Sequence, residues 1–168
     1  RRHTRSPRVT GVLTCALPIF ELISFGTLLH FGSFYGEYYH DTFLDNALMN
    51  TVRDLRNASA HSNCIINKMG ERLDATKQPK SELILFVRHH GVSNQSATTN
   101  MNCKFAYNIV TLLYVYDLLV QEAPKQKRYA QLKEFMNDRV VRNGDYFKSN
   151  SKICSTYNFL KKVIDNLN

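Results

Sequence analysis

Apolar residues recur at helical spacing along most of the chain. Residues 43–61 carry them three and four positions apart, at Leu44, Leu48, Val52 and Leu55, which forms one stripe along one face of a helix. Residues 102–121 carry a denser stripe, made of Phe105, Ile109, Leu112, Leu113, Tyr116 and Leu119. No segment keeps the alternation of apolar and polar residues that a half-buried strand shows. The pattern therefore predicts an all-α protein of about five or six helices in one domain.

The same pattern predicts where the helices begin and end. We expect helices over residues 20–34, 43–61, 81–90, 102–121, 124–142 and 151–167. The first is apolar enough to be a buried helix. The polar stretch 67–80 is typical of a loop, and 91–100 is the most linker-like part of the chain. Boundary signals come from Gly32 and Gly36, from an N-cap at His40-Asp41-Thr42, from Pro124 in a first turn, from Asn143-Gly144, and from an N-cap at Ser151.

Composition places the chain among folded proteins with an anionic partner. Of its 168 residues, 43% are hydrophobic and 21% are charged, which excludes a disordered tail. A formal net charge of +8 favours a partner such as nucleic acid. The four cysteines form no C-x-x-C pair and have no histidine at zinc spacing, so we expect reduced thiols in a cytoplasmic protein, no metal and no cofactor. No apolar run reaches the length of about 18 residues that a membrane span needs.

The first nineteen residues differ from the rest. They resemble the translated sequencing-adapter read-through that opens truncated reading frames in environmental assemblies, so we expect residues 1–19 to be non-native. This segment holds four arginines and no acidic residue, and without it the formal net charge falls from +8 to +4. The expected domain therefore occupies residues 20–168 and is only mildly cationic.

The strongest candidate for chemistry is the pair Arg56 and His61, at the end of the helix expected over 43–61. Asn57 lies four residues before His61, so the two share a helix face and the amide can orient the imidazole. The long side chain of Arg56 can reach toward the same point. The residues between the pair are small and leave room for a bulky ligand or a second helix. Arg53 lies on the stripe of Asn57 and His61, where it is either a supporting residue or a solvated charge.

These residues resemble a known motif. Arg56-Asn-x-x-Ala-His61, followed by Asn67, resembles the catalytic motif of the HEPN superfamily, and most closely that of its abortive-infection (Abi) family. The run LPIFELISFGTL at 17–28 is similar to the family's L-P-x-W-x-x-x-E-x-x-S-F-G-x-L block, so the resemblance covers about residues 20–67. Ser62 and Cys64 stand where many members have a second histidine and an arginine, which affects auxiliary phosphate contacts. Members are usually longer at the N-terminus, so residues 20–168 are expected to be a C-terminal portion.

The resemblance implies a HEPN-like helical bundle and a metal-independent endoribonuclease, the toxin of a phage-defence system. His61 would move the proton of the RNA 2′-hydroxyl or of the leaving 5′-oxygen, because imidazole titrates near neutral pH. Arg56 would hold the phosphate with its charged fork, and Asn57, Arg53 and Asn67 would support the pair. Attack by the 2′-oxygen would leave a 2′,3′-cyclic phosphate. The resemblance also implies RNA as partner, a homodimer through the motif helices, and an antitoxin or non-coding RNA.

Other interpretations of the same residues stay open. Arg56 can pair with Asp54, Asp45 or another surface carboxylate, while His61 caps the helix C-terminus. The chain can be a non-catalytic RNA-binding or protein-binding HEPN module, or an inactive truncated fragment. Arg88 with His89 and His90 can contact a phosphate or simply end a helix. The aromatic residues can stack on bases, although at helical spacing they more often fill a core.

Overall fold

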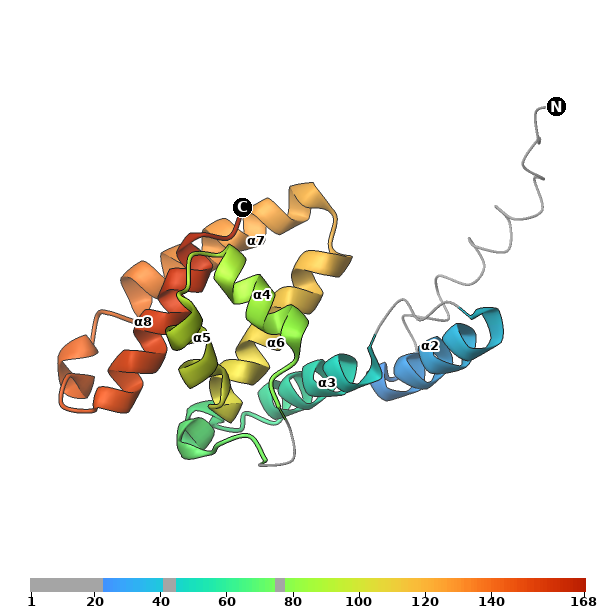
Figure 1. Cartoon of the computed structure of the whole chain (residues 1–168), viewed down its shortest axis with the longest axis horizontal. Coiled ribbons are helices and arrows are strands. Elements are labelled where there is room, and N and C mark those ends of the chain that lie inside the picture. The colour runs from blue at the N-terminus through green and yellow to red at the C-terminus, as the bar shows by residue number, and fades with distance from the viewer. Residues whose placement is uncertain (1–22, 41–44, 75–77) are drawn as a thin grey trace. The chain divides into compact units, whose positions relative to one another are not determined.

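The computed structural model describes residues 23–40, 45–74 and 78–168, except for the side chains of Asn67 and Lys68 (Figure 1). Within these residues the chain is all-α, with seven α-helices and no strand, as predicted. The helices are α2 (Phe25–Tyr39), α3 (Asn46–Ala60), α4 (Ser81–His89), α5 (Asn94–Met101), α6 (Lys104–Leu119), α7 (Glu122–Glu134) and α8 (Ser151–Asp165). The chain divides into two compact units, Arg1–Arg53 and Asp54–Asn168, and the boundary between them falls inside α3.

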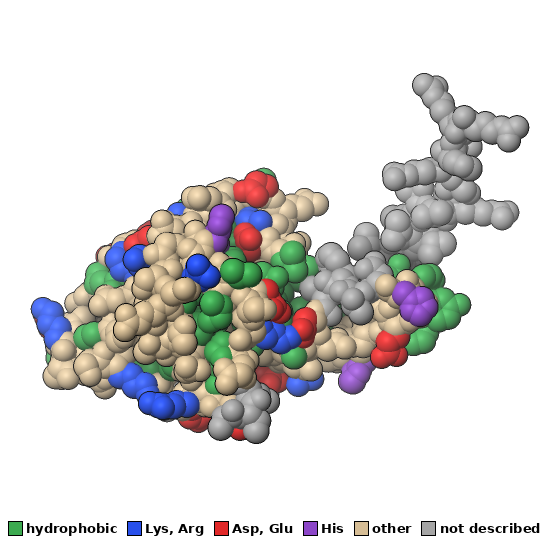
Figure 2. Space-filling model, in the orientation of Figure 1, with side chains coloured by type: hydrophobic (Ala, Val, Ile, Leu, Met, Phe, Trp, Pro, Cys, Tyr) green, Lys and Arg blue, Asp and Glu red, His purple; other side chains and the backbone are tan. Residues whose placement is uncertain are grey.

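Helix α2 belongs to the first unit and is longer and more exposed than its sequence predicts. Ser24 caps it by accepting a hydrogen bond from the Thr27 amide at 3.1 Å, and the helix continues past both expected glycine stops to His40, at φ 54°. Rings one turn apart stack along it, with centroids of Tyr35 and Tyr39 4.4 Å apart. Such pairs favour the helix and offset the cost of the glycines. The expectation of a buried helix over residues 20–34 is wrong for Phe31 and Phe34, which are exposed. Figure 2 shows hydrophobic side chains at the surface of this helix.

Helix α3 begins one residue after Asp45, which acts as its N-cap. The Asp45 carboxylate accepts hydrogen bonds from the amides of Ala47 at 2.7 Å and Leu48 at 3.3 Å. It thereby satisfies two of the free amides of a helix start. The expected cap at Asp41-Thr42, like Leu44 and residues 1–19, lies outside the described residues. Leu48 and Leu55 of the expected stripe are buried.

Five helices form the second unit. In Figure 1, α4 packs against α5 and α6, and α8 packs against α5, α6 and α7. Each helix contributes side chains that are almost fully buried, among them Leu83, Val87, Met101, Val110, Leu113, Tyr129 and Val163. Helix α6 is contacted by α4, α5, α8 and the 3₁₀ helix η1 (Ile65–Gly70), and these neighbours decide which of its side chains are buried. Leu112 and Leu119 of the expected face are exposed, whereas Ala106 and Val110 are buried.

A partly buried polar cluster joins α6 to α7. The hydroxyl of Tyr129 donates to the Asp117 carboxylate at 2.9 Å, and the Lys125 ammonium lies 3.1 Å from the same oxygen. Burial of the hydroxyl and its bond to Asp117 raise the pKa of Tyr129 well above the usual range. Pro124 lies in the first turn of α7, as expected, where its missing N–H costs nothing.

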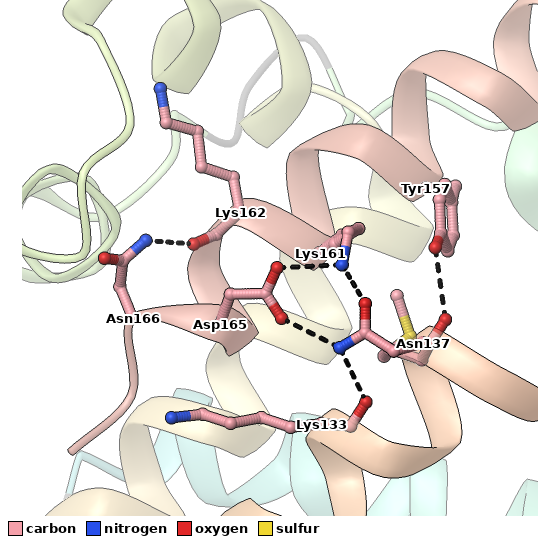
Figure 3. A network of polar contacts seen from close by, with 8 residues as sticks. Lys133, Asn137, Tyr157, Lys161, Lys162, Asp165 and Asn166 are labelled. Carbon is pink, nitrogen blue, oxygen red and sulfur yellow. Dashed lines mark hydrogen bonds and ion pairs between the residues drawn. The ribbon is translucent and has the colours of Figure 1, made fainter.

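The C-terminal helix α8 is fastened to α7 and to the π-helical turn η2 (Phe135–Arg139) by the network in Figure 3. Asn137 donates to the Asp165 carboxylate at 3.2 Å and accepts from Lys161, which also pairs with Asp165 at 2.9 Å. Tyr157 donates to the carbonyl of Met136 at 3.1 Å. These bonds fix the position of α8 against η2.

Two expected boundaries in this unit are wrong. Residues 91–100 are not a linker, because Ser93 caps α5 by accepting from the Ser96 amide at 3.4 Å and the helix buries Ala97 on the core. The N-cap of α8 is Asn150 rather than Ser151, since the Asn150 amide oxygen accepts from two amides of the first turn at 3.1 Å. Asparagine is among the best N-cap residues, and its position decided the start of α8.

Candidate functional site

The pair Arg56 and His61 lies at the C-terminal end of α3, in the second unit. The helix is closed there by two backbone bonds, from Asn63 to the Ala58 carbonyl at 2.9 Å and from Ser62 to the Ser59 carbonyl at 3.1 Å. This is the Schellman arrangement, which needs one residue in the left-handed region, and Ser62 supplies it at φ 54°. His61 is therefore the C-cap residue, and the two backbone hydrogen bonds that close the helix fix the backbone around it.

Arg56 and Asn57 contact each other on the exposed surface of the last turn. Nη1 of Arg56 donates to Oδ1 of Asn57 at 3.2 Å. This bond uses one of the five N–H donors of the guanidinium, and no other described residue accepts a hydrogen bond from it. Within the described residues, no carboxylate forms an ion pair with Arg56, so the structure does not show the expected pairing with Asp54 or Asp45. A free guanidinium fork on an exposed helix end can bind a phosphate.

His61 is exposed, and its ring makes no hydrogen bond to any described residue. The expected contact with Asn57 is absent from the described structure, because the Asn57 oxygen accepts from Arg56 instead. The His61 amide does bond the Asn57 carbonyl at 3.0 Å, so the backbone continues the helix to this residue. Among the described residues, backbone bonds alone fix the position of His61, and its imidazole has no hydrogen-bond partner.

Arg53 and Asn67 are the two other expected supporting residues. Arg53 is half-buried on α3 one turn before Asn57, and it belongs to the first unit. Asn67 lies in η1, and its side chain is outside the described residues. Of the five expected site residues, the structure places Arg56 and Asn57 in contact and His61 on the same exposed helix end.

A pocket in the second unit contains the other basic cluster of the sequence. Arg88, His89 and His90 line it at the end of α4, together with Tyr114 of α6. His90 is not free, because its Nδ1 lies 2.8 Å from the Phe86 carbonyl and its ring packs 4.4 Å from the Phe86 ring. Glu82 and Asp117 also line the pocket, so its charge is mixed. These contacts fit the interpretation of a helix end better than that of a phosphate site.

The described residues contain neither a cluster of metal-ligating side chains nor a long apolar helix. No three His, Cys, Asp or Glu side chains gather there in a group that could hold a metal ion. None of the helices in that part of the chain has both the length and the apolar composition to cross a bilayer. Cys64, Cys103 and Cys154 are unpaired.

Comparison with known proteins adds no relative. No family model, curated protein or solved structure matches this chain. The resemblance to the Abi family of the HEPN superfamily therefore rests on the quoted motifs alone, and the fold supports it only as far as the all-α class.

Proposed function

We propose that this chain is a metal-independent endoribonuclease of the HEPN type, acting in the cytoplasm as the toxin of an abortive-infection system. The observation that carries the proposal is the exposed end of α3, where Arg56 is held by Asn57 at 3.2 Å and His61 follows as the C-cap. Both groups lie on one rigid helix end, and no described carboxylate neutralises the guanidinium. A phosphate diester and its 2′-hydroxyl can be reached from this end.

The two side chains have complementary roles in cleavage. The 2′-oxygen of RNA attacks the adjacent phosphorus, the bond to the 5′-oxygen breaks, and the products carry a 2′,3′-cyclic phosphate and a 5′-hydroxyl. His61 accepts the 2′-hydroxyl proton or donates one to the departing 5′-oxygen. Arg56 binds the non-bridging oxygens and stabilises the charge that develops on them.

A second copy of the chain completes the site in this proposal. In-line cleavage needs one group that accepts a proton and another that donates one, whereas each chain supplies a single motif histidine. The end of α3 is exposed, so one chain alone does not exclude water from the reacting phosphate. Two α3 ends facing each other would supply both histidines and both arginines.

A cleavage assay on the full chain tests the proposal. Purified protein is incubated in EDTA with a labelled mixed RNA and with the same sequences as DNA, beside His61→Ala and Arg56→Ala. We expect wild-type protein to cleave RNA only and to leave cyclic-phosphate ends, and each variant to lose at least about a hundredfold in rate. Matched controls are His89→Ala and Arg88→Ala, which remove the same side-chain types from the end of another helix.

The outcomes separate the alternatives. Equal cleavage by wild type and both α3 variants would remove the site assignment. Folded protein that binds RNA through Arg56 without cleaving it would establish the non-catalytic binding module instead. Protein that remains monomeric at every concentration and yet cleaves would refute the shared site but keep the chemistry.

A further inference from the structure

A second pocket is formed by three segments that lie far apart in the sequence. Arg72 approaches it from the segment after η1, Thr98 and Thr99 from α5, and Lys152 from α8. All of these residues belong to the second unit. It is separate from the α3 end described above, since none of the five candidate residues lines it.

The lining of this pocket is polar and cationic. Among the described residues that form it are two cations and no carboxylate. Five of its side chains carry hydroxyl groups: Thr98, Thr99, Ser151, Ser155 and Thr156. Glu71 is next to Arg72 in the chain, but its carboxylate pairs with Lys104 at 2.9 Å and does not line the pocket. The Thr98 hydroxyl already donates to the Asn94 carbonyl at 3.0 Å, which leaves the other four as donors. Two positive charges and these hydroxyl donors suit a ligand that is doubly negative and rich in acceptor oxygens.

The walls of the pocket are fixed before any ligand arrives. Arg72 forms an isolated antiparallel bridge with Cys103, flanked by backbone bonds from Leu73 to Asn102 at 2.9 Å and from Lys104 to Glu71 at 3.0 Å. The ammonium of Lys152 donates to the Gly70 carbonyl at 3.2 Å, which ties the start of α8 to the end of η1. An ammonium has three donors, so two remain for a ligand.

Thr156 presents its hydroxyl to the pocket. Its residue is only 4% exposed, it lines the pocket, and its hydroxyl makes no hydrogen bond to any described residue. No fully buried side-chain nitrogen or oxygen of the described residues lacks a partner, so this hydroxyl is open to the pocket, where water or a ligand can reach it. The guanidinium of Arg72 is likewise without a partner among the described residues. Both groups therefore have donors left for whatever enters.

We propose that this pocket binds a dianionic phosphate group, either inorganic phosphate or the phosphate monoester of a small molecule. The guanidinium of Arg72 and the ammonium of Lys152 supply the charge, and the hydroxyls of Thr156 and its neighbours bind the remaining oxygens. The free amides at the start of α8 contribute little, because Asn150 already accepts from two of them at 3.1 Å. The ligand is therefore held by side chains, and substitutions can test each of them.

The test is an NMR titration of the full chain with inorganic phosphate and, separately, with ribose 5-phosphate, at constant ionic strength set by sodium chloride. We expect saturable shifts of amides in residues 98–102 and 151–156. Arg72→Gln, Lys152→Gln and Thr156→Val should each weaken binding, the two charge removals by about tenfold or more. The control Lys148→Gln removes an exposed lysine that pairs with Asp145 outside the pocket, and it should bind like wild type.

Several results would overturn the proposal. Shifts that never saturate, or that sodium chloride alone reproduces, would show only general screening. Affinity unchanged in both Arg72→Gln and Lys152→Gln would remove the pocket as the site, provided that the variants keep the wild-type spectrum elsewhere. An RNA oligonucleotide with a 5′-hydroxyl carries only diester phosphates. Tight binding of that RNA at these amides, with no response to inorganic phosphate, would make the pocket a strand-binding surface instead.

Discussion

Removing the hydroxyl of Tyr129 is the sharpest test of how the second unit is held together. Tyr129 is 2% exposed, and its hydroxyl donates to Asp117 at 2.9 Å, across the junction of α6 and α7. Tyr129→Phe keeps the ring and deletes one oxygen. The change therefore isolates a single charge-assisted hydrogen bond in an otherwise unchanged core.

The expected loss of stability depends on which partners Asp117 retains in the Tyr129→Phe variant. A hydrogen bond to a charged group contributes about 1.5–3 kcal/mol. Asp117 retains Lys125 at 3.1 Å, and its side chain is 38% exposed, so water replaces the lost donor in part. We therefore expect a loss near the lower limit, about 1.5 kcal/mol in the free energy of unfolding. For a chain of this size that corresponds to a fall in Tm of about 3–6 °C.

Urea unfolding followed by far-UV circular dichroism measures this loss, with Tyr146→Phe as the matched control. Tyr146 is 82% exposed, so its variant should be as stable as wild type. The pH dependence gives a second readout. Because the pKa of Tyr129 is raised in the folded state, its contribution is complete below the ordinary tyrosine pKa of about 10 and is lost as pH rises further. Tyr129→Phe should lack this alkaline loss. A change below about 0.5 kcal/mol, or an identical alkaline limb, would refute the reasoning.

Two further predictions concern helix ends. Bonds from Lys161 and Asn137 lower the pKa of Asp165, so its stabilisation is present above the ordinary carboxyl pKa of about 4 and is lost as pH falls below it. Asp165→Asn should remove this part of the acid dependence, which amounts to about 0.5 kcal/mol because the group is largely exposed. Urea unfolding at pH 7 and pH 3.5 measures the difference. Ser62→Gly should stabilise the chain by about 0.5–1 kcal/mol, because glycine adopts φ 54° without the cost that serine carries, whereas Ser59→Gly inside α3 should destabilise it by about 1 kcal/mol. Ser62→Gly less stable than wild type would contradict the Schellman assignment.

The sequence predicted the elements whose signals are local and dense. The stripe over 102–121 became α6 at Lys104–Leu119, because apolar side chains recur at helical spacing over its sixteen residues and offer a face that packing can bury. Its buried face was not predictable, since neighbours from four other elements decide which side chains lose water. Helix α5 was missed for the opposite reason. Its eight residues are mostly Ser, Thr and Asn, which favour turns unless tertiary contacts bury Ala97 and Met101.

The candidate site and the phosphate pocket also differ in how far the sequence could predict them. Arg56, Asn57 and His61 lie within six residues, so helical geometry alone placed them on one helix end. It did not foresee that Asn57 would bond Arg56 rather than His61. Arg72 and Lys152 are eighty positions apart, and they line one pocket because the backbone of Arg72 bridges Cys103 and Lys152 bonds the carbonyl of Gly70. No spacing rule connects such residues.

The difference in structure between the α3 end and the pocket also bears on the function of each site. The α3 end is open to solvent and lacks walls, so in the proposal it needs a second chain before it can enclose a reacting phosphate. The pocket between α5 and α8 already has walls held by backbone bonds, which suits binding without chemistry. Substitutions at Arg56 should therefore change RNA cleavage without changing phosphate binding at Arg72. An effect of Arg72→Gln on cleavage would show that the two places act on the same RNA.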